Sequence, residues 1–283
     1  MKRIRRKADN IDYIKFLKSL LDKDIDFLTF KEFVLRGKKK KKSIILRHDI
    51  DYNFESAIEI AKIEKKAGFR STFFLLPPGS HKSLYFDYSK KFIKKCKKIR
   101  GLGHDLGLHN NFFTNHLNTN QDLKVTLRKP LDFLRKNGIE ICGTSCHGDP
   151  LCYNVEYYNY EIWKEFDSLK NEMLNTREFD KVSLSDFGLL YEANFLDYEF
   201  YLSDSGGKWT GIVVDKEKPK YFERSLAKSK ENIGIKVVGE FKKAENGVFQ
   251  ILTHPYWWNI VCLRRMVCRR NVACWLKKVG VKR

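Results

Sequence analysis

Aspartate and histidine residues recur in this 283-residue chain at the points where short apolar runs end. Such runs are typical of buried parallel strands, whose carboxyl ends share one edge of a sheet, where sites are built. Carboxylate and imidazole groups are ligands for Zn²⁺ and similar ions. The convergence of several such strand ends therefore predicts a site for a divalent metal. The residues concerned are Asp49, Asp51, His109, His147, Asp204 and His254.

The elements that must position these residues alternate between apolar runs and helical patterns. Asn53 is a predicted N-cap, and Gly68, Gly101 and Gly138 each close a helical pattern. The alternation favours an α/β fold with a mostly parallel sheet, either a barrel or a doubly wound sheet. Strands are predicted at 43–46, 71–76, 105–108, 139–146, 189–195, 199–202 and 248–252, and helices at 11–21, 56–66, 87–100 and 122–136.

The composition favours one folded domain. Hydrophobic residues make up 42% of the chain, which is enough for a sizeable core and excludes disorder as a global description. We find no internal repeat and no Gly/Pro/Ser-rich linker, so a single domain over residues 1–258 is the simplest organisation. In this interpretation residues 1–42 form a basic N-terminal extension with a helix, and residues 259–283 form a basic amphipathic segment.

The formal net charge of +20 is concentrated in three segments that contain no acidic residue, namely 1–7, 38–42 and 259–283. The rest of the chain is nearly neutral, whereas a nucleic-acid-binding domain spreads its positive charge over a folded face. Nucleic acid is therefore an unexpected partner. These segments could bind an anionic membrane surface or a polyanionic partner. The alternative is that they are charge runs exposed to solvent without a binding role. Segment 259–283 is either a membrane-surface helix or an ordinary helix docked on the domain.

The apolar runs, the cysteines and the absence of nucleotide-binding motifs limit the possible compartments and cofactors. No apolar run reaches the roughly 18–20 residues of a membrane span, and no secretory signal follows the basic start. The seven cysteines form no CxxC pair, so we expect mostly buried free thiols in a reducing compartment. We expect a cytoplasmic protein, either free or peripheral to the membrane. The chain has no P-loop and no GxGxxG turn, so nucleotide binding has no support.

Four short motifs occur in an order that resembles a known family. They are 47–51 (RHDID), 71–75 (STFFL), 103–109 (GHDLGLH) and 252–255 (LTHP). The chain resembles, over about residues 43–258, polysaccharide deacetylases of the NodB-homology type (carbohydrate esterase family 4). Within that family it is most similar to divergent members from bacterial surface-polysaccharide gene clusters. The resemblance implies a distorted (β/α) barrel with a divalent metal, zinc by expectation, at its open end.

The resemblance also implies roles for individual residues. Asp49 matches the family's general base, and Asp51 matches its metal-binding aspartate. His109 matches the first metal-binding histidine, and His254 matches the general acid. For the set Asp51, His109 and His147 the alternative is a strand-end hydrogen-bond network without metal.

One motif departs from the family pattern. The family's second metal-binding histidine lies four residues after the first, and here that position is Phe113. We expect His147 as the third ligand, because a residue at a strand end faces the site without a special loop. His116 is the alternative.

Four residues are expected on the substrate side of the site. Arg47 either pairs with a nearby carboxylate for structural reasons or steadies the base. Asp204 and Trp209 resemble the family's Asp/Trp motif, although Asp204 before Ser-Gly-Gly is also a good turn former. Trp257, in the aromatic run 256–258, either stacks on a sugar ring or forms a core lid.

Two further histidines carry plainer expectations. His48 alternates with Arg47 and Asp49 along its strand, which favours a place in the core. His104 is expected to pack or cap near its strand.

The expected function is a metal-dependent glycan N-deacetylase-like hydrolase. It would act in surface-polysaccharide (O-antigen or capsule) biosynthesis. Its substrate would be an acetamido sugar that is either part of a glycan or linked to a nucleotide or lipid. A metal supplies an activated water and polarises the carbonyl, while a carboxylate and an imidazole move the protons. The alternative is a catalytically silent deacetylase-like protein that binds a glycan or acts as a scaffold.

Overall fold

The computed structural model describes most of the chain between residues 25 and 258. The described residues are Phe16, Leu20 and the ranges 25–37, 42–79, 85–155, 157–169, 180–205, 208–213, 220–225 and 233–258. Of the helix predicted at 11–21, Phe16 and Leu20 are helical and buried, and the rest lies outside the described residues. The segments 1–7 and 259–283 also lie outside them, as does most of 38–42.

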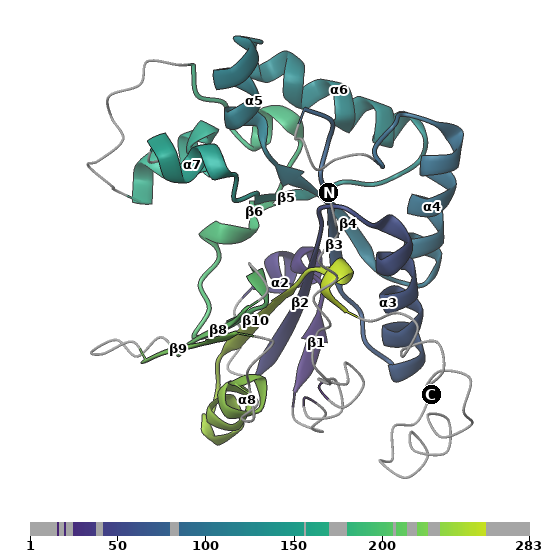
Figure 1. Cartoon of the computed structure of the whole chain (residues 1–283). Helices are drawn as coiled ribbons and strands as arrows, with labels where there is room; N and C mark the ends of the chain where they lie inside the picture. The colour runs from purple at the N-terminus through teal and green to yellow at the C-terminus, as the bar shows by residue number, and fades with distance from the viewer. Residues whose placement is uncertain are drawn as a thin grey trace.

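A mostly parallel, curled sheet forms the centre of the molecule (Figure 1). Its order is β6-β5-β4-β3-β2-β10-β7-β8-β9, with β1 also paired to β2. The ladders from β6 to β7 are parallel, and only β7–β8 and β8–β9 are antiparallel. The strands are β1 (Asp26–Leu28), β2 (Ser43–Ile50), β3 (Thr72–Leu75), β4 (Asp105–Asn110), β5 (Gly143–Cys146), β6 (Tyr191–Glu192), β7 (Phe200–Ser203), β8 (Lys208–Val213), β9 (Lys220–Ser225) and β10 (Val248–Thr253).

Helices connect and flank these strands, so the expected α/β class with mostly parallel strands is confirmed. The sheet forms a curled half-barrel, which is compatible with a distorted barrel, and no ladder among the described residues joins β6 to β9. None of the described helices is long and apolar enough to cross a membrane. The helices are α2 (Phe30–Arg36), α3 (Phe54–Ala67), α4 (Lys90–Gly101), α5 (Phe112–Thr119), α6 (Leu123–Lys136), α7 (Pro150–Val155) and α8 (Ile233–Lys243).

Local sequence signals account for where the helices begin and end. The Asn53 side chain accepts hydrogen bonds from the first turn of α3, and Gly68 ends that helix in the left-handed conformation, as predicted. Ser89 and Asp122 cap α4 and α6 in the same manner. These caps fix the starts of three helices that pack on the sheet.

The two faces of β2 carry different side chains, because alternate residues of a strand point to opposite faces. Ile44, Leu46 and Ile50 belong to the main core, on the side of the helices. Ile45 belongs to a second, smaller apolar cluster that includes Phe30, Phe74 and Tyr191. Arg47 and Asp49 share the face of Ile45, so the inner face of the half-barrel changes from apolar to polar toward the strand ends.

Two glycines on neighbouring strands make room for the aromatic side chains of this inner cluster. A Cβ atom at Gly143 would lie 2.2 Å from the ring of Tyr191, and one at Gly107 would lie 2.5 Å from the ring of Phe74. Side chains at either position would displace rings that fill the floor beneath the polar region.

The sequence prediction of the elements was wrong in several boundaries. β2 continues to Ile50 and β4 to Asn110, so Arg47, His48, Asp49 and His109 lie within strands and not beyond them. The apolar runs end earlier than the strands because the inner face becomes polar. β1, β8, β9, α2, α5, α7 and α8 were not predicted.

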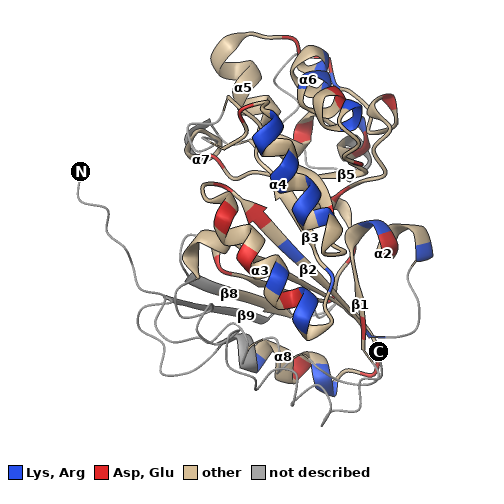
Figure 2. Ribbon diagram, turned by 90° about the vertical axis from the view of Figure 1, so that its right-hand side faces the viewer, with Lys and Arg blue, Asp and Glu red and all other residues tan. Residues whose placement is uncertain are grey.

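Positive charge in the described part of the chain lies mainly on outer helix surfaces. Lysines and arginines follow one another along α4 and recur on α3 and α6 (Figure 2). Lys90, Lys91, Lys94, Lys97 and Lys98 of α4 are exposed. The folded part is therefore nearly neutral in total, but its positive charge is not spread evenly over its surface.

Candidate metal centre and active site

A cavity of about 500 Å³ opens at the carboxyl ends of the central strands. It is formed by residues from β2, β4, β5, β7 and the segment after β10, which are far apart in the sequence. The lining residues include Arg47, Asp49, Asp51, Tyr52, His109, Cys146, His147, Asn194, Tyr201, Ser205, His254, Tyr256 and Trp257.

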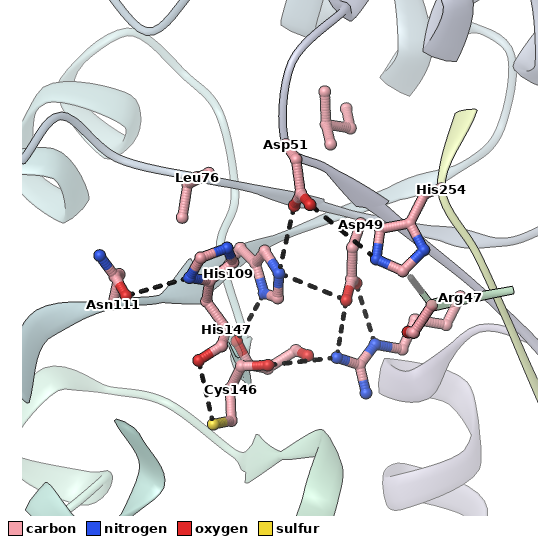
Figure 3. Close-up of polar contacts among 12 residues, drawn as sticks. Arg47, Asp49, Asp51, Leu76, His109, Asn111, Cys146, His147 and His254 are labelled. Carbon is pink, nitrogen blue, oxygen red and sulfur yellow. Dashed lines mark hydrogen bonds and ion pairs between the residues drawn. The ribbon is translucent and has the colours of Figure 1, made fainter. Parts of the chain in front are cut away.

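Three residues in this cavity form a group that could hold a metal ion. One potential ligand atom each from Asp51, His109 and His147 lies within 4.8 Å of the other two, and all three residues are buried. Figure 3 shows these side chains pointing toward one another; His109 lies in β4, and Asp51 and His147 directly follow β2 and β5. The structure therefore brings together the trio expected from the strand ends.

His116, the alternative third ligand, lies elsewhere. It is on α5, where its Nδ1 is 2.8 Å from the carbonyl oxygen of Gln121 and its ring stacks on Phe113. Phe113 is itself buried and packs on Tyr157. Neither residue lines the cavity.

Hydrogen bonding orients the ring of His109 toward the two aspartates. Its Nδ1–H donates to the carbonyl oxygen of Ser145 at 2.9 Å, which leaves the Nε2 atom as the one that faces the cavity. That atom lies 3.4 Å from Asp49 Oδ2 and 3.5 Å from Asp51 Oδ1. Burial lowers the pKa of His109 despite the opposing pull of Asp49 and Asp51, so the ring is neutral and can act as a metal ligand.

His147 is oriented by two asparagines that the sequence analysis did not identify. Its Nδ1 lies 3.0 Å from Asn111 Oδ1, which accepts the ring proton because an amide oxygen cannot donate. Asn159 Nδ2 lies 3.1 Å from the same oxygen and 2.9 Å from the carbonyl oxygen of His147. A backbone or amide acceptor behind each imidazole is the usual support of a metal-binding histidine.

Asp51 supplies the strongest evidence that the group suits a cation. Its Oδ1 atom is buried and accepts no hydrogen bond from the described residues. A buried carboxylate oxygen without a donor is costly, and a bound cation would satisfy it. With two imidazoles and one carboxylate, the donor set is that of a catalytic divalent-metal site.

Arg47 and Asp49 form a bidentate ion pair on one wall of the cavity. Arg47 Nε donates to Asp49 Oδ1 at 2.9 Å, and Nη2 donates to Oδ2 at 2.8 Å. Arg47 Nη1 also donates to Asn194 Oδ1 at 3.1 Å. Burial alone would raise the pKa of Asp49, but the charge and hydrogen bonds of the Arg47 guanidinium hold that pKa well below its ordinary value.

His254 directly follows β10, lies beside Asp49 of the neighbouring strand β2 (Figure 3) and is held from behind by Asp204. Asp204 Oδ1 is 2.6 Å from His254 Nδ1 and also accepts the backbone N–H of His254 at 2.9 Å. The Nε2 atom lies 4.0 Å from Asp51 Oδ2. Burial works to lower the pKa of His254, but the charge and hydrogen bond of Asp204 raise it to about 9. His254 is therefore protonated at neutral pH.

Asp204 does not line the cavity, in contrast to its expected place among substrate-binding residues. Its second oxygen accepts the indole N–H of Trp258 at 3.2 Å. The backbone of Trp209 lies in β8, paired with Arg224, and its side chain lies outside the described part of the structure. Among the described side chains, the tryptophan that contacts Asp204 is Trp258, which the sequence analysis named only as part of the aromatic run 256–258.

Aromatic side chains form the outer rim of the cavity near His254. Tyr52 is half-exposed and meets Tyr256 edge to face, with ring centroids 4.8 Å apart. Trp257 is partly buried, lines the cavity and lies 4.4 Å from Tyr256 by ring centroids. The rim offers apolar ring faces beside the polar trio.

Four of the cysteines belong to the described residues, and all four are free thiols, as expected. Cys96, Cys146 and Cys152 are buried, and Cys142 is half-buried. Burial raises the pKa of each of them, so none is a reactive thiolate.

Comparison with protein-family models, with curated proteins and with solved structures finds no match to this chain. The fold and the site nevertheless define a class. This is an α/β protein whose parallel strands bring two histidines and an aspartate together where a metal ion could bind, beside an ionised aspartate and a protonated histidine.

Proposed function

We propose that this protein is a metal-dependent amide hydrolase that removes the acetyl group from an acetamido sugar. The observation that carries the proposal is that Asp49 and His254 both lie close to the trio of Asp51, His109 and His147. Asp49 Oδ2 is 3.4 Å from His109 Nε2, and His254 Nε2 is 4.0 Å from Asp51 Oδ2. Amide hydrolysis requires a water, a polarised carbonyl and a proton for the leaving amine, and this arrangement offers a group for each.

Asp51, His109 and His147 would hold the metal, for which zinc is our choice because two imidazoles and a carboxylate suit it. When bound, the metal would lower the pKa of a water and polarise the amide carbonyl. Three protein ligands leave coordination positions open for both. The tautomer of each histidine is already fixed by Ser145 and Asn111.

Asp49 would take the proton from the attacking water. Its carboxylate is ionised, because the Arg47 pair lowers its pKa, and its Oδ2 atom faces the metal-binding atom of His109. Arg47 holds both oxygens of Asp49 and so fixes the direction in which they can accept a proton. This geometry favours the second of the two interpretations of Arg47, in which it steadies the base.

His254 would donate a proton to the leaving nitrogen. Its pKa of about 9 keeps it charged at neutral pH, and Asp204 fixes Nδ1 so that Nε2 faces the cavity. An acid and a base with pKa values on opposite sides of neutrality divide the two proton transfers between them.

The resemblance to NodB-type deacetylases supports an acetamido sugar as substrate, and the cavity has a suitable size and rim. A volume of about 500 Å³ falls within the usual range for small-molecule sites. Trp257 and Tyr256 offer ring faces for a sugar. We place the reaction in surface-polysaccharide synthesis in the cytoplasm, on a glycan or a nucleotide- or lipid-linked sugar, with membrane contact through residues 259–283.

The experiment that tests the proposal begins with metal content. The protein is stripped with chelator, reconstituted with Zn²⁺ and assayed for bound metal, beside His109→Ala, His147→Ala and the control His116→Ala. We expect near-stoichiometric zinc in the wild type and in His116→Ala, and loss of zinc in the other two. Equal zinc in all four proteins, or none in any, would overturn the metal site.

A screen of acetamido sugars with the reconstituted protein then tests turnover. Asp49→Asn should abolish acetate release while zinc and sugar binding persist. Zinc and sugar binding without acetate release in the wild type would instead support the silent glycan-binding protein.

A further inference from the structure

A chain of buried polar side chains lies on the helix side of the sheet, directly behind the candidate active site. Its centre is Glu64 of α3, whose side chain is fully buried, as are His48, Ser71 and His104 around it. None of these four residues lines the cavity. Burying a carboxylate is costly, so we expect the hydrogen bonds that Glu64 makes there to have a structural or functional role.

The hydrogen bonds of Glu64 have a defined direction. Glu64 Oε1 lies 2.8 Å from His48 Nε2, and a carboxylate only accepts, so His48 donates from Nε2. His48 Nδ1 lies 2.6 Å from Thr253 Oγ1. On its other side, Glu64 Oε2 accepts the hydroxyl of Ser71 at 2.7 Å. The chain thus joins α3 to β2 and, through His48, to β10.

The position of the His48–Thr253 contact in the sheet gives it significance. The β2–β10 ladder runs from Val248↔Ser43 to Thr253↔His48, so this pair is its last. The next residue on β2 is Asp49, and the next after β10 is His254. Beyond the last pair, β2 remains bonded to β3, whereas the backbone N–H of His254, within the described part of the chain, bonds only to the carboxylate of Asp204.

We propose that Glu64 is a positioning residue that, through His48 and Thr253, sets the place of His254 relative to Asp49. The inference rests on the proposed function for its catalytic meaning, but the geometry it asserts does not depend on turnover. Apolar residues of α3, including Ile60 and Ile63, already pack this helix on the sheet. Hydrogen bonds are directional, so the polar chain fixes the orientation of His48 and Thr253 at the end of the β2–β10 ladder, which apolar contacts do not do.

The experiment uses the metal-free full chain with ¹⁵N-labelled histidine. Long-range ¹H–¹⁵N spectra report the ring of His254 directly, and thermal unfolding reports stability in parallel. The test variants are Thr253→Val, which removes only the hydroxyl, and Glu64→Gln, which removes the charge that fixes His48 Nε2 as a donor. Thr253→Ser restores the hydroxyl. The control is Thr72→Val, because Thr72 is an equally buried threonine two strands from β10 whose hydroxyl accepts the N–H of Phe30.

We expect Thr253→Val and Glu64→Gln to shift the His254 ring resonances in the same direction, and Thr253→Ser to return them toward the wild-type values. Thr72→Val should lower Tm by a similar amount and leave the His254 resonances in place. Unshifted resonances in Thr253→Val or Glu64→Gln would overturn the proposal, and so would an equal shift in Thr72→Val. If Glu64→Gln does not fold, the Thr253 pair still decides whether the contact positions His254.

If turnover of an acetamido sugar is found, steady-state kinetics provide a second test of the positioning role. Thr253→Val should lower kcat about 10- to 100-fold with KM little changed, because a displaced group affects the transition state more than binding. Absence of turnover in the wild type would count against the proposed function alone, since the spectra test the positioning independently.

Discussion

Arg47 and Asp49, two residues apart on β2, form a bidentate ion pair on the inner face of the sheet. Residues i and i+2 of a strand point to the same face, so a single strand supplies both partners. Both are almost fully buried, with side chains 4% and 2% exposed. The candidate base is therefore fixed by its own strand and does not depend on a distant loop for its orientation.

This pair predicts a large stability effect when it is broken. Arg47→Gln leaves the buried charge of Asp49 without its partner and should lower the free energy of unfolding by about 3 to 5 kcal/mol. Urea denaturation at neutral pH measures the change. The control is Lys31→Gln, which breaks the half-exposed Lys31–Glu140 pair and should cost no more than about 1 kcal/mol. Similar losses in the two variants would contradict the prediction.

The amide behind His147 predicts an effect on metal affinity. Asn111→Ala removes the acceptor of the His147 ring proton and should weaken Zn²⁺ binding by about 10- to 100-fold, measured by competition with a fluorescent chelator. Asn115→Ala is the matched control, because Asn115 is also buried and, in the described part of the structure, forms no hydrogen bond with the trio. Unchanged affinity in Asn111→Ala would show that the asparagine does not support the ligand.

Burial of His104 predicts lower stability in mild acid. Burial lowers the pKa of this histidine, with Glu64 opposing the shift, whereas the unfolded chain titrates near the ordinary value of about 6.5. As the pH falls below 6.5, the unfolded state binds the proton first, so the free energy of unfolding decreases. Urea denaturation at pH 7.5 and pH 5 should show a smaller difference in His104→Gln than in the wild type. His116→Gln, at a half-buried position away from Glu64, should keep the full wild-type difference.

The close packing of Tyr191 on Gly143, in the apolar cluster beneath the cavity, predicts a steric effect when Gly143 is replaced. In Gly143→Ala the new methyl group would meet the Tyr191 ring, and the variant should lose about 1 to 3 kcal/mol of stability. A second change, Tyr191→Ala, should cost less in this background than in the wild type. Gly101→Ala is the control, since a Cβ atom there meets nothing within 4 Å and the helix gains propensity. Additive losses at Gly143 and Tyr191 would refute the contact.

The strand ends were predictable because Asp and His follow apolar runs at a parallel-sheet edge. Asp51, His109 and His147 meet for this reason, and His147 was favoured over His116 by the same argument. The boundaries were less predictable. The polar residues 47–49 look like a loop in sequence, yet Asp49 faces the cavity while His48 is bonded to Glu64 within the core.

Contacts that cross the sheet left no signal in the sequence. Asn111 and Asn159 are ordinary asparagines until the fold places them behind His147. Asp204 was associated with Trp209 through their spacing, but the indole that bonds to it comes from Trp258, beyond β10. Such partners depend on which strands are neighbours, and the insertion of β10 between β2 and β7 could not be read from local pattern.

That insertion has a consequence for how the protein folds. β10 is the last described strand in the chain, yet it pairs with β2, about 200 residues earlier, and with β7. Until it is in place, the facing edges of β2 and β7 have unpaired backbone groups, which invite association with other chains. Contacts so distant in sequence form slowly. The sheet closes at its centre late, and the same event brings His254 to Asp51, so the site is completed only when the fold is.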